Sequence, residues 1–147
     1  MARGGGGQRS RAWPGAKEYD PGVKRQRRIV HYPDPVLRQR AKPVAKVDEA
    51  IRDLVREMFE IMDEEEGIGL AAPQVGESLR IFVTGARADE GHPHLVYINP
   101  VLSGFAGDLE VHDEGCLSLP GIRGDIRRQP HAVIEATDLE GRPFRLE

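Results

Sequence analysis

The clearest alternation of apolar and polar positions lies in residues 48–65. Apolar residues recur there at intervals of three and four, which draws a single stripe along a helix. The stripe consists of Ile51, Leu54, Val55, Met58, Phe59 and Met62. Asp48 stands just before it and is a suitable N-cap. The pattern predicts an amphipathic helix that buries this stripe against a sheet, at about 1.5–3 kcal/mol per large side chain.

The chain after this helix predicts strands. Short runs rich in β-branched and aromatic residues occupy 79–83, 95–102, 132–137 and 143–146. Turn residues at 138–141 join the last two runs, and Pro100 is expected to bend or end the second. A short extended run at 29–32 and at most one helical turn at 36–38 precede the helix. These elements predict an α+β fold in which one N-terminal amphipathic helix packs on mostly antiparallel strands.

Length and composition agree with one compact domain. The chain has 147 residues, of which 39% are hydrophobic and 31% are charged. No run reaches the roughly 18 apolar residues of a membrane span, so no membrane partner is expected. The single cysteine cannot form an internal disulfide, so nothing demands an oxidising compartment.

The N-terminal segment differs from the rest in charge and pattern. Residues 1–28 hold eight Lys or Arg and two acidic residues, a net charge of +6; against the total of −3, the remainder carries −9. We predict a disordered, basic, Gly/Arg-rich extension at 1–27 and a domain at 28–147. We expect an ordinary flexible extension and a location in the bacterial cytoplasm; contact with the ribosome and a role as an organellar transit peptide are the alternatives. The acidic body argues against specific nucleic-acid binding.

Two segments of small residues, 67–76 and 114–121, stand out from this scaffold. Gly67 would end the helix in a left-handed conformation. Glycines in a strand-like run indicate that another backbone lies close by, either a neighbouring strand or a bound peptide. Gln74 is the polar side chain of the first segment and can both donate and accept hydrogen bonds.

Cys116, in the second segment, is open to two chemistries. As a thiolate it would ligate a metal. As a nucleophile it would need a base, and His112 is the nearest candidate in sequence. A buried cysteine with only a packing role is the alternative. His92 and His94 flank a proline in the loop at 86–94 and are expected to form a surface pair.

The sequences GIGLAAPQ (residues 67–74) and EGCLS (residues 114–118) resemble the first and second signature motifs of peptide deformylases. The segment YPDPVLR (residues 32–38) is also similar to that family. Two motifs of this length, in this order, are far more specific than one short motif. The resemblance implies an enzyme that hydrolyses the formyl group from N-terminal formylmethionine in new bacterial and organellar proteins.

The resemblance also implies individual roles. Cys116 would be a thiolate ligand of a divalent metal, Fe²⁺ first, with Zn²⁺ or Ni²⁺ as substitutes. Gln74 and the backbone N–H of Leu117 would stabilise an oxyanion. The substrate peptide would lie against Ile68, Gly69 and Gly115.

One departure changes this expectation. The third motif of the family, His-Glu-x-x-His on a helix, supplies two metal ligands and the general base, and it does not occur in this sequence. We therefore expect a C-terminally truncated member whose 147-residue form has little turnover, since catalytic metals usually have three protein ligands. The alternatives are a non-catalytic peptide-binding module and a thiol hydrolase.

Overall fold

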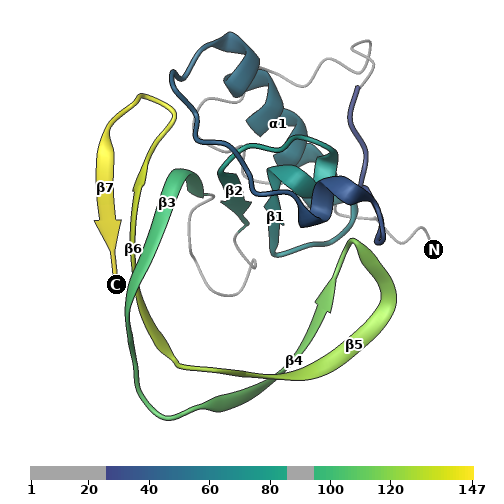
Figure 1. The fold of residues 1–147 in the computed structure, drawn as a ribbon, viewed down its shortest axis with the longest axis vertical. Helices are drawn as coiled ribbons and strands as arrows, with labels where there is room; N and C mark the ends of the chain where they lie inside the picture. Colours follow the sequence, from purple (N-terminus) through teal and green to yellow (C-terminus); the bar gives the residue numbers. More distant parts are fainter. Residues whose placement is uncertain (1–25, 86–94) are drawn as a thin grey trace, which may run out of the picture.

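The computed structural model describes residues 26–85 and 95–147, and it combines one α-helix with two antiparallel sheets (Figure 1). The elements are η1 (Pro35–Arg38), α1 (Glu49–Glu64), β1 (Gly69–Ala71), η2 (Ala72–Val75), β2 (Ile81–Thr84), β3 (Leu95–Ala106), β4 (Glu110–Cys116), β5 (Leu119–Arg128), β6 (His131–Thr137) and β7 (Pro143–Leu146). This confirms the predicted α+β class. The predictions for residues 1–25, His92 and His94 lie outside the described residues, and the domain boundary at 27/28 stays a prediction.

Helix α1 confirms the amphipathic pattern. Asp48 is its N-cap, and the Asp48 side chain accepts a hydrogen bond from the Ile51 N–H at 3.0 Å. All six residues of the predicted stripe are buried. They form one core with other residues of α1, of the main sheet, of η2 and of the β6–β7 turn, namely Ile61, Leu70, Ala72, Val75, Ile81, Val83, Ile98 and Leu139.

The end of α1 differs from the prediction for Gly67. The residue with a left-handed backbone is Glu66, at φ 54°, and the Gly67 N–H then donates to Met62 O at 2.8 Å. This is the Schellman arrangement, shifted so that glycine comes one residue after the left-handed position. A Cβ atom on Gly67 would lie 3.0 Å from Leu117 Cδ1. The small size of Gly67 therefore serves close packing against Leu117, and the left-handed position of the helix end is Glu66.

Replacing Glu66 with glycine should stabilise the protein. A left-handed conformation costs an ordinary residue about 1–2 kcal/mol, a cost that glycine largely avoids. Glu66→Gly is therefore expected to raise the free energy of unfolding by about 1 kcal/mol in chemical denaturation. Glu66→Ala is the matched control, because it removes the same charge but keeps the strained backbone. Equal stabilisation by both variants would show that charge, not backbone conformation, is responsible.

The main sheet has the strand order β1-β2-β3-β6-β7, with every neighbouring pair antiparallel. Strand β3 is longer than predicted, because Pro100 bends it without ending it. Its register against β6 shifts between Ile98 and Val101, and Asn99 adopts φ 51°. The Asn99 side chain satisfies both backbone groups of Val44, at 2.8 and 2.9 Å, which anchors the bend to the segment before α1.

The second sheet is the hairpin of β4 and β5, which the sequence pattern did not predict. Nearly all of its residues are exposed on both faces, so no alternation of apolar and polar positions marks it. Figure 1 shows this curved ribbon at the side of the molecule opposite to α1. Ion pairs across the strands, Arg128 with Glu114 and Arg123 with Asp113, brace it.

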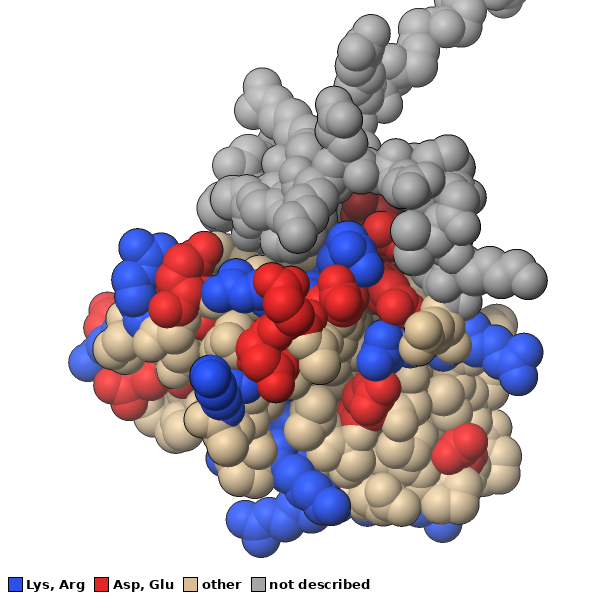
Figure 2. All heavy atoms as spheres, turned by 90° about the horizontal axis from the view of Figure 1, so that it is seen from above, with Lys and Arg blue, Asp and Glu red and all other residues tan. Residues whose placement is uncertain are grey.

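The surface of the described residues mixes both signs of charge. On the face shown in Figure 2, acidic side chains form a band with Lys and Arg side chains around it, rather than one continuous basic patch. A broad electrostatic footprint for nucleic acid is therefore not present on that face. Among the described residues, no helix is long and apolar enough to cross a membrane.

Candidate functional site

Cys116 lies at the tip of the β4–β5 hairpin. It is the last residue of β4 and pairs with Leu119, after a register shift that follows Gly115. Leu117 and Ser118 form the connection between the strands. The thiol is exposed, so the interpretation of Cys116 as a buried packing residue is wrong. The tip presents the thiol to solvent from a hydrogen-bonded support.

Gln74 lies in η2, which directly follows strand β1. The Gln74 Oε1 atom accepts from the Ala71 N–H at 3.0 Å, which fixes the orientation of the amide. Its Nε2 group then donates to Cys116 Sγ at 3.5 Å and to Ser118 Oγ at 3.3 Å. The structure thus brings together the two segments that the sequence singled out, although 42 residues separate Gln74 from Cys116.

Ser118 is a member of this cluster that sequence reasoning did not identify as functional. It is buried, and its backbone carbonyl accepts from the Tyr32 N–H at 2.9 Å while its hydroxyl accepts from Gln74. The only sequence signal for it was a hydroxyl residue inside the second motif. Ser118 fixes the position of the turn, because a buried polar group requires partners.

Leu117 connects the exposed thiol to the core. Its backbone N–H directly follows Cys116, and its half-buried side chain packs against the core and against Gly67. The contact with Gly67 positions the hairpin tip next to the start of β1. The amide expected to stabilise an oxyanion therefore belongs to a residue whose side chain is held in place.

Strand β1 is at the end of the main sheet, so one of its edges faces no strand of that sheet. The Ile68 carbonyl accepts from the Gly85 N–H at 3.0 Å and therefore points toward β2. Because successive carbonyls alternate along a strand, the backbone of Gly69 faces the open edge. The Ile68 side chain is 59% exposed, and Gly115, on β4, is also exposed. These are the three residues expected to contact substrate.

The charged groups nearest the tip are paired with one another. Arg128 hydrogen-bonds Glu114 through both carboxylate oxygens, and this lowers the pKa of the Glu114 carboxyl. A lowered pKa means that the stabilisation is present above the ordinary carboxyl range and is lost as the pH falls through the folded value. His112 faces Glu110 at 3.6 Å. The Cys116 sulfur accepts a hydrogen bond from the Gln74 amide, which is no base, so the thiol hydrolase hypothesis gains no support.

The described residues do not by themselves form a metal centre. Within 26–85 and 95–147, no group of three or more His, Cys, Asp or Glu side chains could hold a metal ion. Cys116 supplies one thiolate with the right chemistry, whereas catalytic zinc sites use three protein ligands. The donor set of the described residues is therefore incomplete for a metal.

The open strand edge is one to which an extended peptide can add as a strand, and the exposed thiol and the oriented amide lie beside each other on the same α+β scaffold. The sequence model of the polypeptide deformylase family matches residues 26–147. The chain belongs to the peptide deformylase family.

Individual relatives agree with this assignment. A peptide deformylase of Cellvibrio japonicus is 44% identical over 119 residues, which are 81% of this chain and 70% of the relative. The chloroplastic peptide deformylase 1B of Solanum lycopersicum is 39% identical over 81% of this chain and 43% of its own length. A crystal structure of a Synechococcus elongatus peptide deformylase superimposes with TM-score 0.78 at 42% identity, covering 84% of this chain and 68% of that one. The chain thus spans between 43% and 70% of the length of these relatives.

Family membership supports a hydrolase over a non-catalytic module. Members of this family are metal-dependent enzymes that remove the formyl group from nascent peptides. The relatives and the fold therefore support the interpretation of the two sequence motifs as those of a peptide deformylase.

Proposed function

We propose that this chain carries the peptide-binding and oxyanion-stabilising parts of a site that deformylates N-formylmethionyl peptides. The contact that supports this most directly is the one from Gln74 Nε2 to Cys116 Sγ, at 3.5 Å. It joins the two signature segments at one exposed point beside the open edge of β1.

The substrate would bind as an added strand. An extended peptide that approaches β1 meets the outward backbone groups of Gly69, and the exposed Gly115 of the β4–β5 hairpin is the other expected backbone contact. Small residues on both sides leave room for the peptide backbone. Ile68 would contribute its exposed side chain, since its carbonyl is already bonded to Gly85.

The formyl carbonyl would then lie at the hairpin tip, between two donors. One is Gln74 Nε2, oriented by Ala71, and the other is the backbone N–H of Leu117. Donors of this kind act by being fixed where negative charge develops, and each is worth about 2.7–4 kcal/mol in comparable sites. We propose a divalent metal, Fe²⁺ first and Zn²⁺ or Ni²⁺ as substitutes, with Cys116 as its only ligand among the described residues.

The remaining parts of the proposal concern the surroundings of the site. Formylated nascent chains leave the ribosome, and the basic residues 1–28 would bring the protein close to it by charge attraction. The proposed substrate implies a compartment with formylated protein synthesis, which would be the bacterial cytoplasm or an organelle.

Peptide titration tests the proposed groove. A formyl-Met peptide should bind the chain, and Gly69→Pro should weaken this binding about tenfold, because it removes one outward N–H and its hydrogen bond. Isothermal titration calorimetry measures both affinities, with the unformylated Met peptide as a control ligand. Equal affinity of Gly69→Pro for the formyl-Met peptide would contradict binding along β1.

A further inference from the structure

Glu57 is the only charged side chain of the described residues that is buried, with 7% of its surface exposed. It lies on α1, among the apolar residues that face the core. A carboxylate removed from water requires compensating donors. Those donors come from the N-terminal end of the described chain, 30 and 31 residues away in sequence.

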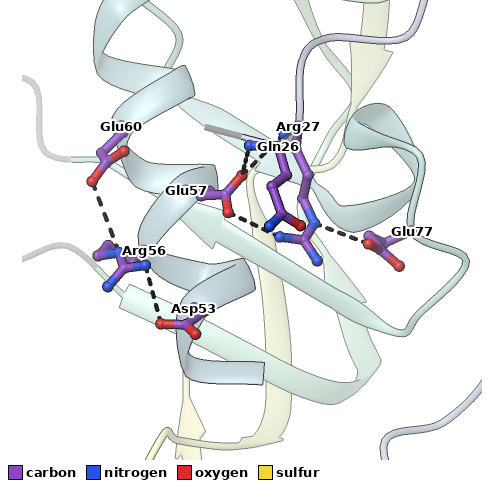
Figure 3. Close-up of polar contacts among 7 residues, drawn as sticks. All are labelled: Gln26, Arg27, Asp53, Arg56, Glu57, Glu60 and Glu77. Carbon is purple, nitrogen blue, oxygen red and sulfur yellow. Dashed lines mark hydrogen bonds and ion pairs between the residues drawn. The ribbon is translucent and has the colours of Figure 1, made fainter. Parts of the chain in front are cut away.

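Three hydrogen bonds satisfy this carboxylate. Its Oε2 atom accepts from the backbone N–H groups of Gln26 and Arg27, at 3.2 and 3.1 Å. Its Oε1 atom accepts from Arg27 Nη1 at 3.0 Å. Arg27 also donates from Nε to Glu77 Oε1 at 2.9 Å, so its guanidinium bridges two acids (Figure 3). Glu77 follows Gly76, which caps the short helix that carries Gln74.

The residues that follow Arg27 continue from this anchor to the site. The Val30 N–H donates to Gln74 O at 2.8 Å, and two residues later the Tyr32 N–H donates to Ser118 O at 2.9 Å. We call residues 26–32 the strap. The strap is hydrogen-bonded at one end to α1 and at the other to Gln74 and Ser118, which lie next to the Cys116 thiol.

We propose that the strap, anchored by Glu57, is a positioning device that sets the distance between the Gln74 amide and the hairpin tip. Glu57 is a positioning residue, since it acts through the strap and touches neither the thiol nor the substrate edge. The catalytic purpose of this device rests on the proposed function. The physical content of the proposal, that Glu57 controls the geometry around Gln74, is measurable without turnover.

The arrangement gives a role to Glu57, the acidic residue among the buried residues of α1. Gln74 and Ser118 belong to different elements, η2 and the β4–β5 turn, and side-chain bonds alone would join them. Two backbone bonds from one extended segment, made two residues apart by Val30 and Tyr32, add a brace that spans both elements. Fixing that segment at Glu57 limits its freedom, because a segment outside helices and sheets is ordered only where other groups hold it.

The test is amide NMR of the full chain with Glu57→Gln, which keeps the size of the side chain and removes its charge. We expect the Gln74 side-chain amide signals to shift and the Val30 and Tyr32 amide protons to exchange about tenfold faster, as for the loss of one ordinary hydrogen bond. Amide protons in the middle of α1 should exchange as before. A general loss of stability would instead speed all slowly exchanging amides together.

Asp53→Asn is the matched control. Asp53 lies on the same helix and pairs with Arg56 at 3.1 Å, but Asp53 is exposed, Arg56 is half-buried, and neither side chain bonds to the strap (Figure 3). It should leave the Gln74 signals unchanged. If Glu57→Gln does not fold, Arg27→Gln takes its place. This variant keeps both backbone donors to Glu57 and removes the guanidinium, and it is expected to cause the same changes at Gln74, Val30 and Tyr32. Unchanged Gln74, Val30 and Tyr32 signals in the folded variant, or the same changes in Asp53→Asn, would overturn the proposal. Neither result depends on whether the chain deformylates peptides.

Discussion

Joining a helix that carries His-Glu-x-x-His to the C-terminal end of this chain is expected to produce a protein that retains one divalent metal ion and releases formate from a formyl-Met peptide. The described residues supply one thiolate, Cys116, and a catalytic metal needs about three protein ligands. Two histidines on one helix face complete that number. Metal content after dialysis and formate release are the two measurements.

The 147-residue chain is the first control; because its described residues supply one of about three ligands, it should retain less metal and release less formate than the extended protein. The second control is Cys116→Ser in the extended protein. Exchanging the thiolate for a hydroxyl should lower both metal retention and turnover, because a neutral hydroxyl is a far weaker ligand than a thiolate. If the extended protein held no more metal than the original chain, the assignment of Cys116 as a ligand would be wrong.

Gln74→Glu in the extended protein is expected to lower kcat about 10²–10³-fold, the range found when one oxyanion donor is removed elsewhere. The substitution is selective because the oxygen and the nitrogen of the Gln74 side-chain amide have different partners. Its Oε1 atom accepts from the Ala71 N–H, and a glutamate oxygen can replace it there. Its Nε2 group faces Cys116 Sγ and Ser118 Oγ, and glutamate has no donor for that side.

Gln74→Met is the comparison for this experiment. It removes the bond to Ala71 as well as the donor, so it should reduce stability in addition to kcat. Gln74→Glu should unfold at a denaturant concentration close to that of the parent protein. Metal content must be measured alongside, since a carboxylate beside the thiolate adds repulsion between like charges. A kcat within a few-fold of the parent, at full metal content, would remove Gln74 from the catalytic role.

The parts of the fold with a strong apolar period were predictable. Helix α1, its Asp48 cap and strands β2, β6 and β7 each show a clear pattern, and the structure confirms them within about two residues. The β4–β5 hairpin was missed because both of its faces are exposed, so it has no buried side to impose alternation. Gly67 was misread because its small size serves a contact with Leu117, which no local pattern records.

The candidate site was predictable only in part. The motifs identified Gln74 and Cys116, and their contact agrees with the expectation that the two segments meet. Ser118, the strap and Glu57 depend on bonds between residues 30 to 86 positions apart, which sequence periodicity does not report. Glu57 in particular occupies a helix position at which an acid would ordinarily be assigned to the solvent-facing side.

The exposed position of the only cysteine has a practical consequence for handling the protein. One accessible sulfur atom per chain allows stoichiometric attachment of a dye or spin label at the hairpin tip without removing other thiols. The same accessibility leaves the sulfur open to stepwise oxidation by peroxide, and the sulfinic and sulfonic products are not reversed by added thiols. Preparations intended for metal loading therefore require reducing, oxygen-poor buffers from the first purification step.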